Sequence, residues 1–382
     1  MIPVLALLVA AAALAGPSVP VTITEVEPNS TKAAATPATL APGGAVTGTS
    51  AGSDSNPVAT GISTVDTYFV TLPQNPGIWR HRLTLTTSGP IGHALSIRGL
   101  TQTNGVVVAG TDVAAVTSSG TTTPARFVQC YGYGAAAPQM YIRVAGIGAT
   151  SSPYRVTLAS ERVQWSRFPR VIPPGPVTIS TVGQTTADTE LILLDSAFNL
   201  LPGAVNDDTP AGPGTPARVQ STLHPTFTPG LFYLGVTDFD AVTSEPSPTD
   251  DANRSSPLLD FPGIVATAST LANLNLAFAI TGATGPALLP AAGTTTKLGA
   301  FDILWFRLRV TCSLADVASL GGTHIPDGAI TPDDLIVFLG AFFTNDLDSA
   351  DVASLGGDPA PDGRTTPDDI IAFLGAFFAD CP

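Results

Sequence analysis

Residues 315–322 read Ala-Asp-Val-Ala-Ser-Leu-Gly-Gly, and the same eight residues return at 350–357. Pro-Asp-Gly-x-x-Thr-Pro-Asp-Asp at 326–334 returns at 361–369, so every acidic position is displaced by 35 residues. A repeat that keeps its carboxylates while other positions change indicates a paired cation-binding unit, because a hard cation such as Ca²⁺ needs several oxygen ligands on a turning loop. This stretch therefore predicts a duplicated calcium-binding module.

Each copy of the repeat also predicts one helix. Thr331 and Thr366 are suited to the N-cap, and each is followed by Pro at the first helical position and by two Asp in the first turn. Apolar residues then recur at helical spacing: Leu335, Phe338, Leu339 and Phe342 in the first copy, and Ile370, Phe373, Leu374 and Phe377 in the second. We expect two amphipathic helices that pack on each other through this aromatic seam.

The candidate calcium ligands follow from the spacing of an EF-hand loop, which places oxygens at positions 1, 3, 5, 7 and 12 and Gly at position 6. Asp327 and Asp362 fit position 5, the carbonyls of Ala329 and Arg364 fit position 7, and Asp334 and Asp369 fit position 12. Strict spacing puts Thr323 or Asp358 at position 1, whereas the recurring Ala-Asp-Val favours Asp316 and Asp351. The alternative is that these acids only cap helices and keep the surface soluble.

The composition indicates a β-rich chain of two or three domains. It has 382 residues with 37 Gly and 35 Pro, and 44% of the residues are hydrophobic whereas only 12% are charged. The formal net charge is −14 and no cluster of Lys or Arg is present, which argues against nucleic acid and anionic membranes as partners. Beyond the first residues, no stretch has the ~18 to 20 apolar residues that span a bilayer.

The two ends of the chain suggest export. Residues 1–15 form an apolar run that ends in Ala-Leu-Ala, and we interpret them as a cleaved signal peptide, with an N-terminal core helix as the alternative. Cys312 and Cys381 bracket the repeat and could form a disulfide in an oxidising compartment, although two free thiols remain the alternative. Cys130 is left over and is expected to be a buried apolar thiol.

Short alternating strands separated by Gly, Pro and Ser precede the module. Between residues 21 and 160 they resemble the bacterial pre-peptidase C-terminal domain, a jelly-roll-like sandwich, on the strength of a Glu-Pro-Asn-x-Thr opening at 27–31 and Asp-x-Tyr-x-Val at 66–70. Residues 170–311 look similar, with strand patterns at 188–195, 229–236, 274–281 and 301–310 and a surface loop at 244–259. Asp188, Asp207 and Asp208 could form another calcium site at one end of this second sandwich, and solvated acidic turns are the alternative.

Residues 312–382 resemble a dockerin, the duplicated loop-and-helix module that binds cohesin domains, and more narrowly the dockerin-like segments of planctomycete-type secreted proteins. Together with the strand patterns and the resemblance to the pre-peptidase C-terminal domain, this predicts a mainly β chain: two antiparallel jelly-roll-like β-sandwiches followed by a small α-helical module. The resemblance to dockerins also implies a secreted or cell-surface protein, docked by that module to a cohesin-like or other envelope or extracellular protein. The sequence departs from the EF-hand pattern in two ways: no Asp or Asn holds position 3, and position 12 is Asp where sensor EF-hands have a bidentate Glu.

The sequence shows no catalytic set. Its four His lie in separate segments, and a Gly-x-Ser-x-Gly match at 48–52 lacks the strand and helix that a serine hydrolase places around it. We therefore expect a non-catalytic protein. The alternative is a secreted hydrolase or carbohydrate-binding protein with a glycan groove on one sandwich and the module as an anchor.

Overall fold

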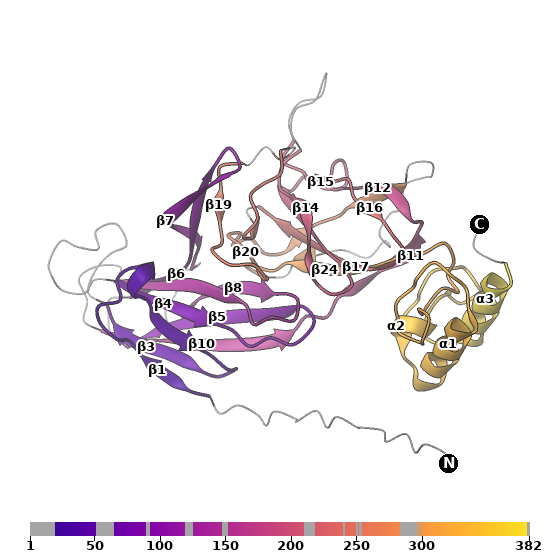
Figure 1. The fold of residues 1–382 in the computed structure, drawn as a ribbon, viewed down its shortest axis with the longest axis horizontal. Coiled ribbons are helices and arrows are strands. Elements are labelled where there is room, and N and C mark those ends of the chain that lie inside the picture. Colours follow the sequence, from indigo (N-terminus) through magenta and orange to yellow (C-terminus); the bar gives the residue numbers. More distant parts are fainter. Residues whose placement is uncertain are drawn as a thin grey trace, which may run out of the picture.

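The computed structural model describes residues 20–50, 65–88, 92–118, 125–146, 152–209, 218–239, 241–249, 251, 254–282, 296–297 and 299–379. The predicted signal peptide at 1–15 and Cys381 lie outside these residues. The chain is mainly β, with two β-sandwiches and a small helical module, as Figure 1 shows. The predicted fold class is therefore confirmed.

The first sandwich packs two sheets face to face. One sheet has the order β1 (Thr22–Thr24), β3 (Ala45–Thr49), β10 (Pro153–Arg162), β5 (Trp79–Thr87) and β8 (Ala125–Gly132). The other has the order β6 (His93–Thr103), β9 (Gln139–Gly146), β4 (Val65–Thr71) and β2 (Thr36–Thr39), with β7 (Val106–Thr117) also on β6 and the short 3-10 helix η1 (Lys32–Ala34) before β2. Most pairs are antiparallel, but β1 with β3 and β2 with β4 are parallel.

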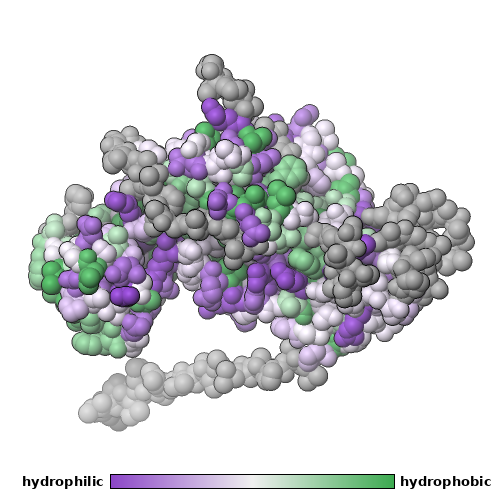
Figure 2. All heavy atoms as spheres, turned by 180° about the vertical axis from the view of Figure 1, so that it is seen from behind, coloured by the Kyte–Doolittle hydropathy of each residue, from purple (hydrophilic) through white to green (hydrophobic). Residues whose placement is uncertain are grey.

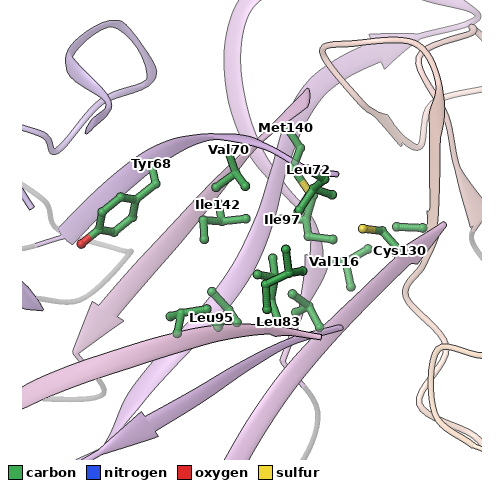
Figure 3. Close-up of a cluster of buried hydrophobic side chains, with 14 of the residues drawn as sticks. Tyr68, Val70, Leu72, Leu83, Leu95, Ile97, Val116, Cys130, Met140 and Ile142 are labelled. Atoms are coloured by element: carbon green, nitrogen blue, oxygen red, sulfur yellow. The ribbon is translucent and has the colours of Figure 1, made fainter. Parts of the chain in front are cut away.

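Alternate residues of these strands point inward and form one apolar core, shown in Figure 3. Val70 and Ile142 from one sheet meet Leu83 and Cys130 from the other. Cys130 is a free thiol with 1% exposure, as predicted, and burial raises its pKa.

A later segment completes this first sandwich. Strand β20 (Ile264–Thr267) pairs with β8 and carries β18 (Ala241–Val242) on its other edge, while β19 (Pro257–Leu258) pairs with β6. Leu259 and Ile264 are buried in the first core. The prediction that 244–259 is only a surface loop is wrong, because Pro257–Leu258 at its end adds a strand to the sheet of β6 and Leu259 is buried in the first core.

The second sandwich has its own apolar core. One sheet has the order β11 (Ser166–Ile172), β24 (Leu304–Val310), β17 (Gly230–Asp238), β13 (Thr189–Leu194) and β14 (Leu200–Asn206). In the other, β12 (Gly175–Ser180) pairs with β15 (Thr222–Leu223), β16 (Thr226–Phe227) and β22 (Ala279–Gly282), and β21 (Leu274–Asn275) pairs separately with β23 (Thr296–Lys297). The strand expected at 274–281 is thus two short strands. Phe278 is fully buried against Phe168 and Phe306.

The module contains α1 (Pro332–Thr344), α2 (Leu347–Ala350) and α3 (Pro367–Phe377), and it lies beside β11 in Figure 1. Both main helices begin at the predicted Thr-Pro pairs. The equivalent rings of Phe338 and Phe373 are fully buried and stack at 3.9 Å between centroids with an interplanar angle of 11°. The two copies therefore meet through matching residues. Within the described residues, no helix has both the length and the apolar character required to cross a membrane.

Candidate metal sites and the duplicated module

The three acids predicted to form a site in the second sandwich do come together. Carboxylate oxygens of Asp188, Asp207 and Asp208 all lie within 4.8 Å of one another. The reason is local: Asp188 precedes β13, the Asp pair follows β14, and these strands are antiparallel, so the start of one lies beside the end of the other. Burial raises the pKa of Asp208. The geometry suits a divalent cation, because a bound cation would relieve the repulsion among three close carboxylates.

A small acidic cavity adjoins this trio. Asp207 lines it together with Glu190, Glu245 and Asp251, and no Lys or Arg is among the residues of its wall. Asp207, Glu190 and Asp251 are each at most 5% exposed, and burial raises the pKa of Glu245. The negative charge of the trio thus continues into the wall of this cavity.

A second acidic trio, which the sequence analysis did not identify, lies on the first sandwich. Carboxylate oxygens of Glu25, Glu27 and Asp66 lie within 4.8 Å of one another. A hydrogen bond from the Thr67 N–H to the Asn29 carbonyl, 3.0 Å, holds the opening segment beside β4. Glu25, Glu27 and Asn29 alternate in sequence, which was the available signal, because alternate residues of an extended segment can present their side chains on one side.

Asp66 is the buried member of this trio, with 0% exposure. The Tyr154 hydroxyl donates to its Oδ2 at 2.6 Å, whereas its Oδ1 and the Oδ1 of fully buried Asn29 accept no hydrogen bond. Burial, with smaller contributions from the nearby Glu25 and Glu27, raises the pKa of Asp66 to about 9. Buried oxygens without donors beside two further carboxylates are the donor set that a hard cation requires.

The aspartates of the module are arranged differently, because their carboxylates face backbone N–H groups. Asp334 Oδ1 accepts from the N–H groups of Val317 and Ala318, both at 2.8 Å, and its Oδ2 accepts from the N–H and hydroxyl of Thr331 at 2.8 and 3.1 Å. Asp369 repeats every one of these bonds. The last pair of bonds is the helix cap, whereas the first ties the helix to the start of its own copy.

The other predicted carboxylate ligands do the same. Asp316 accepts from the N–H groups of Asp327 and Gly328 at 3.0 and 2.8 Å and from the Thr311 hydroxyl. Asp327 accepts from the N–H groups of Leu320 and Ala329, and Asp333, in the first turn of α1, accepts from the N–H of Gly321 at 2.9 Å. The backbone bonds recur in the second copy on Asp351, Asp362 and Asp368. Gly328 and Gly363 have φ of +87° and +85°, as a sharp turn at this position requires.

Three predicted positions do not add ligands to this arrangement. Asp358 is exposed, and its backbone carbonyl accepts from the N–H groups of Ser354 and Ala360. Ala329 and Arg364 face the loop aspartates through their N–H groups. Across the described part of the module, no three acidic side chains bring oxygens within 4.8 Å of one another. The residues present therefore fit a cation in the sandwiches better than in the module.

The module also exposes large apolar side chains in matching pairs. Leu320 and Leu355 are 82% and 79% exposed, Ile336 and Ile371 are 67% and 68%, and Phe343 and Phe378 are 81% and 80%. Ile336 and Phe343 are seven residues apart, so they lie on one face of α1. Figure 2 shows apolar surface on this module from behind. We call these six residues the paired apolar surface.

Cys312 forms a disulfide, whose predicted partner Cys381 lies outside the described residues. Comparison of the chain with protein-family models and with curated proteins finds no match. The likenesses to pre-peptidase C-terminal domains and to dockerins thus stay predictions from the sequence.

Proposed function

We propose that this chain is a secreted, non-catalytic modular protein whose C-terminal module docks it to a protein of the cell envelope or the extracellular space. The observation that carries the proposal is the paired apolar surface. Water-exposed Leu, Ile and Phe are unfavourable singly, and here they recur at the same positions of both copies with nearly equal exposure. A cohesin-like protein is the partner class that the resemblance to dockerins implies.

The helix packing supports a docking role for this surface. Phe338 and Phe373 are fully buried in the module core, whereas Phe343 and Phe378 lie outside that core. Each outward ring instead meets the partly buried Phe next to it edge-on, at an interplanar angle of 88° in both copies. Both copies therefore present the same rigid aromatic feature, as a protein-binding surface requires.

In this proposal, calcium binds to the two sandwiches. The trio of Asp188, Asp207 and Asp208 and the trio of Glu25, Glu27 and Asp66 each gather carboxylate oxygens where one cation would offset their repulsion. The first trio joins the ends of two consecutive strands, and the second joins the opening segment to β4. A bound cation would thus stabilise each sandwich against unfolding.

The rival function is a hydrolase or carbohydrate-binding protein. Such a protein would present an aromatic-lined cleft, but neither the acidic cavity beside Asp207 nor the cleft between β11 and the module contains Trp in its wall. Trp305 is buried at 3% exposure, and Trp165 packs on Phe198 and Tyr233. No observation in the described residues favours this rival.

Retention on envelope fractions tests the proposal. The full chain should bind to envelope of the producing cell, and replacing Ile336, Phe343, Ile371 and Phe378 by Ser should lower the bound fraction by about tenfold or more. The matched control replaces Val106 and Val108, which are 66% and 40% exposed on β7, by Ser. Equal retention of the module variant and the control would contradict the docking role.

A further inference from the structure

We propose that the two acidic loops of the module keep their shape without a metal ion, with Arg167 and Arg309 of the second sandwich supplying the positive charge that a cation would. The proposal rests on the proposed docking function and adds how that surface is regulated. Docking would then be independent of calcium, although the module resembles one that requires it.

The first argument is that the carboxylates of Asp334 and Asp369 are already saturated with hydrogen bonds. An ionised carboxylate has about four lone-pair sites. Asp334 accepts four hydrogen bonds, and Asp369 accepts the same four, so the residues expected at the bidentate calcium position have no lone pair to offer. A metal would have to displace these bonds from buried N–H groups, which would leave the donors unsatisfied.

The second argument is the direction of the loop amides. A calcium loop points carbonyl and carboxylate oxygens at its centre, because Ca²⁺ takes about six to eight oxygen ligands. Here N–H groups converge on Asp316 from Asp327 and Gly328, and the same occurs at Asp351 in the second copy. The local dipoles thus favour an anionic side chain at the centre and oppose a cation.

The third argument is that an arginine stands beside each of the two Asp at the start of the loops. Arg167 on β11 forms ion pairs with Asp351 at 3.2 Å and with Asp348 at 3.1 Å. On the adjacent β24, Arg309 donates to the backbone carbonyls of Leu314 and Asp316, and its charge acts to lower the pKa of Asp316 against the effect of burial. The pKa of Arg309 is itself lowered by burial to about 10, so it stays charged at neutral pH.

These arginines also fix where the module lies. Because β11 and β24 are neighbours in the second sandwich, both charges come from one sheet and meet the two copies at the same junction. Arg307, next to them, pairs with Asp348 at 3.2 Å. Arginines of the second sandwich therefore offset the negative charge of the loops once the module packs against it. No ion from solvent is required.

Hydrogen–deuterium exchange on the full chain tests this, read in peptides covering 316–334 and 351–369. We expect exchange in both loops to agree within about twofold in EDTA and in millimolar calcium. Arg167→Ala should raise exchange in the second loop by about tenfold or more, because it leaves buried Asp351 without its cation. Arg170→Ala, an exposed Arg on the same strand, is the control and should change nothing.

Two results would overturn the proposal: calcium slowing exchange in both loops by about tenfold or more relative to EDTA, or Arg167→Ala leaving the second loop as protected as the control does. Arg309→Met extends the test to the first loop, and if that variant fails to fold, the Arg167 comparison still decides. The measurement needs no partner. If the chain fails to dock but its loops are independent of calcium, only the proposed function is contradicted. If the chain docks but its loops depend on calcium, only this inference is contradicted.

Discussion

The sandwiches and the module both collect acidic side chains, but the groups that face these carboxylates differ. In the sandwiches, carboxylates such as those of Asp188 and Asp208 face one another within 4.8 Å. In the module, carboxylates such as those of Asp334 and Asp316 face amide N–H groups of their own loops. The comparison teaches that a count of acids does not predict a metal site, because what decides it is whether oxygens or N–H groups converge.

The largest effect on stability is expected from Asp334→Ala. The change leaves the buried N–H groups of Val317 and Ala318 without an acceptor and removes the helix cap of Thr331. Each orphaned donor costs about 1–3 kcal/mol, and the cap adds about 1 kcal/mol. Chemical denaturation followed by circular dichroism should show the helical module unfolding first.

The control for that experiment is Asp358→Ala, an exposed Asp in the same module. It should change the free energy of unfolding by less than about 0.5 kcal/mol. Equal destabilisation by the two variants would mean that the carboxylate of Asp334 does not brace its loop.

The next largest effect on stability is expected from calcium binding to the sandwiches. Calcium at a hundredfold excess over the dissociation constant should stabilise the native state by about 2.7 kcal/mol per site, seen as a higher Tm. Asp208→Asn should remove the contribution of the second sandwich, and Glu27→Gln that of the first. In EDTA, both variants should be neutral or slightly stabilising, because one acidic group of each close cluster is gone. If calcium still raises the Tm of a chain that carries both changes, calcium binds at a site other than these two trios.

The pH dependence of the metal-free first sandwich follows from Asp66. Its native pKa is raised to about 9, whereas the unfolded chain releases the proton near 3.8. The native state therefore binds more protons across this interval, so its stability is highest at the acid end and falls as the pH rises towards 9. Denaturation in EDTA at several pH values should show this slope, and Asp66→Asn should flatten it. A slope of the opposite sign would show that Asp66 is ionised in the native state.

The smallest effect on stability is expected at the paired apolar surface. Ile336→Ser with Phe343→Ser alters one copy, and Ile371→Ser with Phe378→Ser alters the other; either pair should shift the Tm little, since these side chains are largely exposed. Envelope retention should survive the loss of one copy and fail when both are changed, because the copies present the same residues. Complete loss with a single copy would show that the two surfaces act together as one.

Much of the local structure could be predicted from local patterns. The Thr-Pro-Asp-Asp helix starts, the Asp-Gly turns and the packing of Phe338 on Phe373 depend on residues close in the sequence or on helical spacing, and the structure has all of them. The convergence of Asp188 with Asp207 and Asp208 was also predicted, because β13 and β14 are consecutive strands. The Glu25, Glu27 and Asp66 trio was missed, because the opening segment and β4 are brought together only by the tertiary fold.

The sequence by itself determined that the chain is mainly β, that its C-terminal part is duplicated, and which residues begin and line each helix, because these depend on periodicity and short-range capping. Only the tertiary structure decided that β18, β19 and β20 complete the first sandwich, that Arg167 reaches Asp351, and which direction each carboxylate faces. Those outcomes depend on the direction of backbone groups and on partners more than a hundred residues away. Neither can be predicted from the spacing of residues in the sequence.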